Sequence, residues 1–170
     1  GYSAVIMENH GTVVGGIDLS DAFQRFETLA FCARTGIYGN MIGKINNLSD
    51  KAIDDFYAQI PVALPEMDDV SYPREERAKR TEILQIVERS CVHGLMISSY
   101  GTVSTRWKGN DFLITPTGIS RWDLKLEDIV QIKEGKREPG KIPSRTTYLH
   151  QQIYSSNPNI NSIILTQSPY

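Results

Sequence analysis

Hydrophobic residues in the first part of the chain are spaced as in two short strands followed by two helices. Residues 1–7 and 12–14 are short apolar runs, and the first of them predicts a buried strand. The helix that follows begins at Asp18 or Ser20, both favourable N-cap residues. Apolar side chains then recur at steps of three or four, which predicts one buried stripe: Ala22, Phe26, Leu29, Ala33 and Ile37. A second helix is predicted from Ser49 to Ile60.

The second part of the chain also alternates between helices and short strands. A helix is predicted from Arg74 to Val92, with Gly94 placed to cap its C-terminus. Glu134 and Gly135 mark a turn further along. Four other segments are predicted in chain order: strands at 103–107 and 112–115, a helix at 144–156 and a strand at 161–166. Because the long parallel βαβ rhythm is missing, the pattern favours the α/β class with a mixed or antiparallel sheet.

Composition narrows the classes of protein to which the chain can belong. Its 170 residues are enough for a domain with a hydrophobic core, and 40% of them are hydrophobic. The 18 basic and 20 acidic side chains nearly cancel, so charge gives no indication of binding to nucleic acid or to an anionic membrane. The apolar runs are too short to cross a bilayer. Cys32 and Cys91 lie in helical patterns, which predicts buried free thiols in a reducing, cytoplasmic compartment.

Four motifs follow one another in the second part of the chain. Residues 94–106 read GLMISSYGTVSTR, 112–119 read FLITPTGI, 143–158 read PSRTTYLHQQIYSSNP and 165–170 read LTQSPY. They resemble, in the same order, the segments GL…SGNxSxR, LITPTG, PSSExxxHxxIY…P and HTHSPY of the class II aldolase/adducin family. One such motif is a weak signal, whereas four in the correct order and spacing identify the chain as similar to this family.

The first part of the chain resembles a different piece of the same family domain. Residues 4–15 (AVIMENHGTVVG) and the helix after them are similar to the family's LLxNHGxxxxG strand and the helix that follows it. In the family this piece comes after HTHSPY, whereas here it comes first. The chain is therefore a circularly permuted domain or a slice through a tandem pair. A permuted domain would keep the section that joins HTHSPY to NHG, and its absence favours the tandem pair.

The tandem interpretation divides the chain into three parts. Residues 1–60 are the C-terminal part of a first aldolase-like repeat, 61–79 are a linker, and 80–170 are the N-terminal part of a second, degenerate repeat. The resemblance implies a three-layer α/β/α sandwich with a central mixed, largely antiparallel sheet, incomplete in this fragment. It also implies a divalent metal, usually zinc, that polarises the oxygens of a phosphorylated sugar during aldol cleavage.

The positions that bind metal in the family are mostly changed in this chain. His10 matches one family histidine and is the candidate metal ligand; a buried histidine bonded to the backbone is the alternative. Leu165 and Gln167 replace the two histidines of HTH, and neither leucine nor a neutral amide is a good zinc ligand. Thr146 replaces the family glutamate, and a hydroxyl does not replace a carboxylate in acid–base catalysis. We therefore expect no metal in these residues and no catalytic residue among them.

The phosphate-binding positions of the family are better preserved. Thr117, Gly118 and Ser144 match family residues, whereas Thr102 replaces an asparagine. Arg145 takes the place of a second serine, where it either pairs with an anion or lies in solvent as a surface charge. The resemblance thus implies a phosphate site built from Thr117, Gly118, Ser144 and Arg145.

Two classes of function remain open. The first is a metal-dependent aldehyde-lyase, or an epimerase, acting on a phosphorylated sugar, with this segment itself inactive. The second is an adducin-like scaffold that has no catalytic site. In either case the resemblance implies a homo-oligomer, and the sequence predicts neither a nucleic-acid nor a membrane partner.

Overall fold

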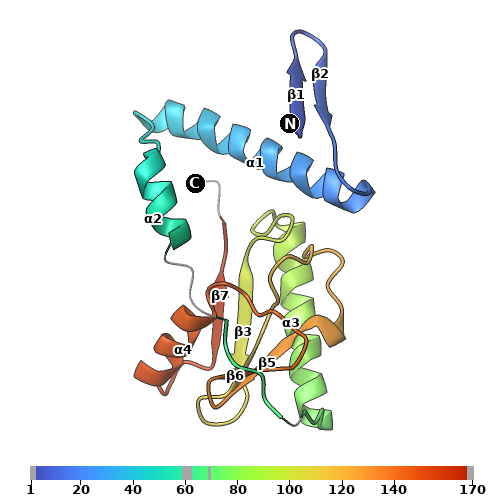
Figure 1. The fold of residues 1–170 in the computed structure, drawn as a ribbon, viewed down its shortest axis with the longest axis vertical. Coiled ribbons are helices and arrows are strands. Elements are labelled where there is room, and N and C mark those ends of the chain that lie inside the picture. Colours follow the sequence, from blue (N-terminus) through green and yellow to red (C-terminus); the bar gives the residue numbers. More distant parts are fainter. Residues whose placement is uncertain (1–2, 59–62, 69, 168–170) are drawn as a thin grey trace.

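The computed structural model describes residues 3–58, 63–68 and 70–167. A two-stranded hairpin and a long helix lie at one end of the molecule, and a five-stranded sheet with its helices lies at the other (Figure 1). The first end contains β1 (Ala4–Met7), β2 (Gly11–Val14), α1 (Leu19–Ile42) and α2 (Asp50–Ala58). The second contains α3 (Arg74–Val92), β3 (Thr102–Arg106), β4 (Phe112–Ile114), a 3-10 turn at Leu126–Asp128, β5 (Val130–Lys133), β6 (Lys136–Arg137), α4 (Thr147–Ser156) and β7 (Ser162–Leu165).

The five-stranded sheet has the order β6-β5-β4-β3-β7, and each neighbouring pair is antiparallel. β4 is the central strand, and β3 lies between β4 and the edge strand β7. β5 and β6 form a hairpin whose turn residues Glu134 and Gly135 both have positive φ, at 51° and 75°, as a tight hairpin turn requires. The predicted α/β class with a largely antiparallel sheet is confirmed.

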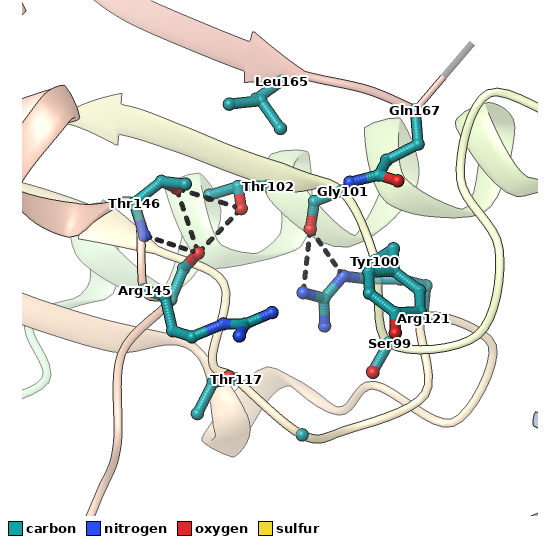
Figure 2. Close-up of a pocket in the computed structure, with 12 residues that line it drawn as sticks. Ser99, Tyr100, Gly101, Thr102, Thr117, Arg121, Arg145, Thr146, Leu165 and Gln167 are labelled. Carbon is teal, nitrogen blue, oxygen red and sulfur yellow. Dashed lines mark hydrogen bonds between the residues drawn. The ribbon is translucent and has the colours of Figure 1, made fainter. Parts of the chain in front are cut away.

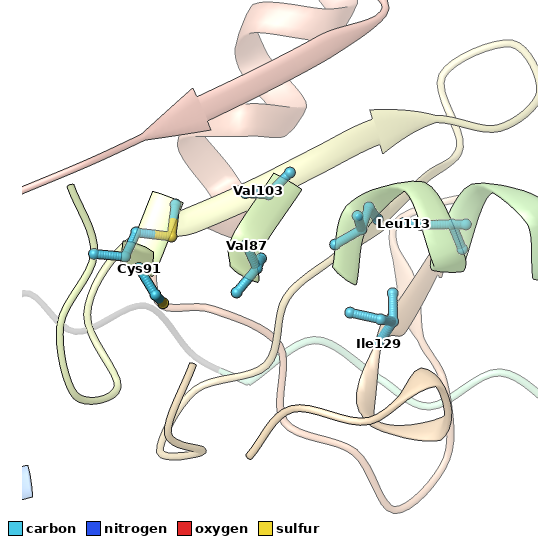
Figure 3. Close-up of a cluster of buried hydrophobic side chains, with 7 residues drawn as sticks. Val87, Cys91, Val103, Leu113 and Ile129 are labelled. Carbon is cyan, nitrogen blue, oxygen red and sulfur yellow. The ribbon is translucent and has the colours of Figure 1, made fainter. Parts of the chain in front are cut away.

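Two hydrophobic clusters cover opposite faces of this sheet because neighbouring residues of a strand point to opposite sides. On one face, Ile83, Val87 and Cys91 of α3 pack on residues that include Val103 and Leu113 (Figure 3). On the other face, Tyr154 of α4 packs with Phe112, Ile114, Val130 and Ile132. Each such buried side chain contributes about 1.5–3 kcal/mol. The helices and sheet therefore form the three layers that the resemblance implies.

The helix predicted from Arg74 to Val92 has these same limits in the structure. Its last turn ends through the His93 N–H, which donates to the Arg89 carbonyl, and through Gly94, whose φ is 66°. Glycine adopts this left-handed conformation without the steric cost that other residues meet. The prediction that Gly94 caps the C-terminus of this helix is therefore confirmed.

The predicted burial of the first part of the chain was wrong. No residue of α1 is buried, the strand Ala4–Met7 is largely exposed, and Cys32 is exposed. α1 meets the rest of the molecule through polar side chains: Glu27 and Gln24 accept hydrogen bonds from Ser98, and the Ser20 hydroxyl donates to Asp123. The predicted stripe of α1 is therefore not buried, and its Phe26 and Ile37 are exposed, although Asp18 caps the helix as expected.

A buried network of charged residues joins α3 to the segment after β6. Arg80 is fully buried and pairs with Glu76 at 2.7 Å and with Glu138 at 2.9 Å. Burial would raise the pKa of Glu138, but hydrogen bonds from Lys141, Tyr72 and other donors outweigh it and hold that pKa below its usual range. Removing one member of such a network leaves the others as uncompensated buried charges.

We predict that Arg80→Met lowers the free energy of unfolding by about 3–5 kcal/mol, because Glu76 and Glu138 lose their shared partner. Urea unfolding followed by circular dichroism measures this loss. Arg25→Met is the control, since Arg25 pairs with Asp21 on the surface and should cost under about 1 kcal/mol. Similar small losses in both variants would contradict a structural role for the buried network.

Candidate functional site

A pocket of about 180 Å³ lies where β3 and β7 meet the start of α4 and the loop after β4 (Figure 2). Eight of its twelve lining residues were singled out from sequence: Thr102, Thr117, Gly118, Ser144, Arg145, Thr146, Leu165 and Gln167. The other four are Ser99, Tyr100, Gly101 and Arg121. Residues far apart in the sequence are therefore brought to one place, although His10 is not among them.

Three hydroxyl groups on one side of the pocket form a closed ring of hydrogen bonds. The Ser144 hydroxyl lies 2.8 Å from that of Thr102 and 3.1 Å from that of Thr146, and the Thr146 hydroxyl lies 3.3 Å from that of Thr102. Thr102 is the cross-strand partner of Leu165, so the leucine stands beside the ring. Each hydroxyl can rotate to donate to a ligand. The ring is therefore a set of neutral donors that can serve an anion.

The start of α4, next to this ring, and the turn after β4 supply further parts of the lining. The Thr146 N–H points to the Ser144 hydroxyl at 3.4 Å, and Gly118 has a φ of 75° that suits glycine. Arg145 is exposed, and its side chain has no hydrogen-bond or ion-pair partner within the part of the chain that is described. Its guanidinium extends over the pocket in Figure 2. Five N–H donors are thus free to bind an anion in a bidentate manner.

Arg121 was missed by the sequence analysis. Its side chain is 3% exposed and donates to the carbonyl oxygens of Gly101, Ile119 and Pro116 at 2.8–3.1 Å. Burial lowers its pKa to about 10, which leaves the guanidinium charged at neutral pH. No periodic pattern or family motif marks this arginine, because its role depends on the path of the loop that carries it.

The pocket residues do not fit a divalent metal ion. Leu165 offers no donor atom, Gln167 offers a neutral amide, Thr146 offers a hydroxyl, and two guanidinium groups repel a cation. Across the described residues no cluster of three His, Cys, Asp or Glu side chains is arranged to hold a metal ion. His10 lies in the exposed turn between β1 and β2, outside the pocket. Within this pocket no step of Lewis-acid catalysis can be assigned.

His150 lies buried behind the pocket, one turn after Thr146 on α4. Its Nδ1 is 2.7 Å from the Ser104 hydroxyl, which in turn lies 2.7 Å from the Tyr154 hydroxyl. Its Nε2 is buried with no hydrogen-bond partner among the described residues. Burial lowers the pKa of His150 to about 4, so the imidazole is neutral at pH 7. This histidine fixes α4 to β3 and thereby holds the start of α4 at the pocket.

We predict that this buried histidine makes stability depend on pH. In the unfolded chain a histidine takes up its proton near pH 6.5, whereas folded His150 does so only near pH 4. Folding is therefore most favoured above pH 6.5, and His150 alone should remove about 3 kcal/mol of stability as the pH falls to 4.

The variant His150→Asn keeps a polar group near Ser104 but cannot titrate. It should flatten the pH dependence of the unfolding free energy between pH 6.5 and 4, measured by urea denaturation. His93→Asn, at an exposed position, should leave the wild-type dependence intact. An unchanged slope in His150→Asn would show that another group titrates.

The order of the sheet and the position of the pocket define a class II aldolase-type domain. The sequence matches the family model of the class II aldolase and adducin N-terminal domain over residues 1–37 and 81–170. The chain therefore belongs to the class II aldolase/adducin family, as the motifs indicated.

Among its relatives, the L-fuculose phosphate aldolase of Haemophilus influenzae is 34% identical over 94 residues, which cover 52% of this chain and 43% of that protein. The 5-methylthioribulose-1-phosphate/5-deoxyribulose-1-phosphate aldolase of Escherichia coli is 36% identical over 95 residues, which cover 55% and 44% of the two chains. The chain thus spans less than half the length of these relatives.

A solved structure supports the fold. YgbL, described as a putative aldolase/epimerase/decarboxylase from Escherichia coli, superposes on 56% of this chain and 46% of its own with a TM-score of 0.53 and 24% identity. Because the sequence identity is only 24%, this similarity is evidence for the fold alone.

Proposed function

We propose that the pocket binds the phosphate group of a small phosphorylated ligand and performs no chemistry on it. The observation that carries this proposal is the lining itself: hydroxyl groups and two arginines face the pocket, and among the described residues no carboxylate, imidazole or lysine does. A phosphate ester carries a charge of about −1.5 to −2 near neutral pH, which the two guanidinium groups balance.

Each part of the lining has a separate role in this binding. Arg145 donates two parallel hydrogen bonds to phosphate oxygens, as guanidinium groups do with planar or tetrahedral anions. The hydroxyls of Thr102, Ser144 and Thr117 supply neutral donors around the anion. The start of α4 adds the positive end of a helix dipole. All of these groups hold a ligand in place, and none of them is a general base at neutral pH.

For the whole protein we propose a metal-dependent aldehyde-lyase acting on sugar phosphates, because the relatives that it resembles are aldolases of sugar phosphates. In that protein His10 would be a metal ligand and the described pocket would belong to a second repeat that has lost its ligands. Residues 1–60 would then end the first repeat and 80–170 would begin the second. An epimerase and a non-catalytic, adducin-like scaffold are the alternatives. No helix in the described segments is long and apolar enough to cross a membrane.

Thermal unfolding in phosphate tests the pocket proposal. We predict that phosphate at about 100 times its Kd raises the free energy of unfolding by about 2.7 kcal/mol relative to chloride of equal ionic strength. Arg145→Gln should weaken phosphate binding roughly tenfold, because charge-assisted hydrogen bonds are lost. Arg34→Gln removes an exposed arginine of α1 outside the pocket and should bind phosphate as the wild type does. Equal melting in both salts would show that the pocket binds no phosphate.

We also infer that exposed apolar side chains of α1 pack on a second copy of the chain. Phe23, Phe26, Ile37 and Met41 recur at helical spacing and are 45–78% exposed. One family domain model matches both the segment with α1 and the segment with the sheet, so a sheet of this type is a suitable partner for that helix. Among the described residues β7, with exposed Ile164, is an edge strand of the sheet. Such apolar surface is unusual on a monomer.

Sedimentation equilibrium at micromolar concentration tests the association. The wild type should sediment as a dimer or larger species, and Phe23→Ser with Ile37→Ser should shift it toward the monomer by removing apolar area. Thr35→Ser, on the same helix, is the control. A wild type that remains monomeric at about 100 micromolar would have a dimer Kd well above that concentration, and this result would refute the inference.

A further inference from the structure

Arg121 carries a buried positive charge without a buried negative one beside it. Its four hydrogen bonds all go to backbone carbonyl oxygens. In the described part of the chain no carboxylate lies within ion-pair distance of this guanidinium. Cys91, which interacts with it electrostatically, is a neutral thiol because burial raises its pKa to about 11. Burying an ion without a counter-ion is costly.

Arg80, which is also buried, has charged partners where Arg121 has none among the described residues. Arg80 is matched by two buried carboxylates, those of Glu76 and Glu138. Arg121 differs from Arg80 because it lines the pocket and has carbonyl partners alone. Four of its five N–H groups are used in these bonds, which leaves one donor and the full charge for whatever enters the pocket.

The hydrogen bonds of Arg121 also determine the shape of the pocket. Gly101 directly precedes Thr102, and Pro116 directly precedes Thr117, so Arg121 joins the two chain segments that carry these threonines. The backbone of Arg121 is held in turn, because its N–H donates to the Ser98 carbonyl at 2.8 Å. Gly101 has a φ of 94°, and an added Cβ would lie 2.5 Å from the Met96 side chain. The backbone is therefore closely packed at Gly101, whose carbonyl accepts two of the Arg121 hydrogen bonds.

We propose that the charge of Arg121 makes the pocket select doubly charged tetrahedral anions, phosphomonoesters above all, over singly charged ones. The proposal rests on the proposed function of the pocket as a phosphate site. The ligand supplies the counter-charge that the protein lacks, while Arg145 makes the direct bidentate contact. An anion of charge −2 gains about twice the Coulomb energy of one of charge −1 at the same place.

Two probes of similar shape and different charge test this selectivity. Inorganic phosphate at pH 8 is mainly a dianion, and methanesulfonate is a tetrahedral monoanion. Isothermal titration of both into the wild type, Arg121→Gln and Arg121→Lys gives a ratio of affinities for each protein. Arg106→Gln is the matched control, since Arg106 also donates to several backbone carbonyls but lies outside the pocket.

We expect the wild type to bind phosphate at least about tenfold more tightly than methanesulfonate, with Arg121→Lys within about threefold of that ratio. Arg121→Gln should reduce the ratio about fivefold or more, and Arg106→Gln should keep it even where its melting temperature falls. If Arg121→Gln does not fold, the ratio of affinities in Arg121→Lys still tests the inference. Lysine keeps the positive charge but changes the hydrogen bonds to the carbonyl oxygens, so an unchanged ratio assigns the selectivity to the charge.

Each contrary result has a separate meaning. A wild type that binds neither probe overturns the proposed phosphate pocket and with it this inference. A wild type that binds phosphate while Arg121→Gln keeps the same ratio overturns the inference about Arg121 alone. A tenfold loss of the ratio in Arg121→Lys assigns the effect to the carbonyl bonds instead of the charge, which also overturns it.

Discussion

The alternation of side chains along β3 is the constraint on which the rest of the structure depends. Val103 points to the α3 face and joins the larger hydrophobic cluster. Thr102 and Ser104 point to the α4 face, where they bond to Ser144 of the pocket and to His150 of α4. A shift of one residue in the pairing with β7 would exchange these faces. Core packing, the attachment of α4 and the hydroxyl ring are therefore consequences of a single register.

Much of the second region could be predicted from sequence because its signals are local. The limits of α3 follow from its apolar spacing and from Gly94, and the turn at Glu134 and Gly135 follows from residues that adopt positive φ. Eight pocket residues were singled out from sequence because a family resemblance relates positions that are distant along the chain. The strands β5 and β6 were not predicted, although the turn between them was.

Features that depend on long-range packing could not be predicted. The apolar stripe of α1 has the spacing of a buried face, yet what covers such a face is a property of the tertiary structure. Cys32 was predicted to be buried and is exposed in the structure for the same reason. No sequence pattern marked Arg121 as a pocket residue, because its three carbonyl partners are brought together only by the folded loop. The placement of His10 in the family metal site stays a prediction.

We propose that this pocket keeps the ligand binding of a family framework while its chemistry has changed. Leu165, Gln167 and Thr146 stand at the positions that the resemblance assigns to imidazole and carboxylate side chains, and on this proposal neither the metal ligands nor the proton-transfer group is present. Arg145 and Arg121 add positive charge to the same space. A site that held a cation beside a phosphate would thus become one that holds the phosphate alone.

The most direct test of this account is a two-dimensional amide NMR titration of the chain with phosphate and, separately, with zinc. The account predicts that phosphate shifts the amide signals of Thr117, Gly118, Arg145 and Thr146, which surround the pocket. Dilute zinc should leave those signals unchanged. Shifts centred on Thr146, Leu165 and Gln167 with zinc, and none with phosphate, would contradict it.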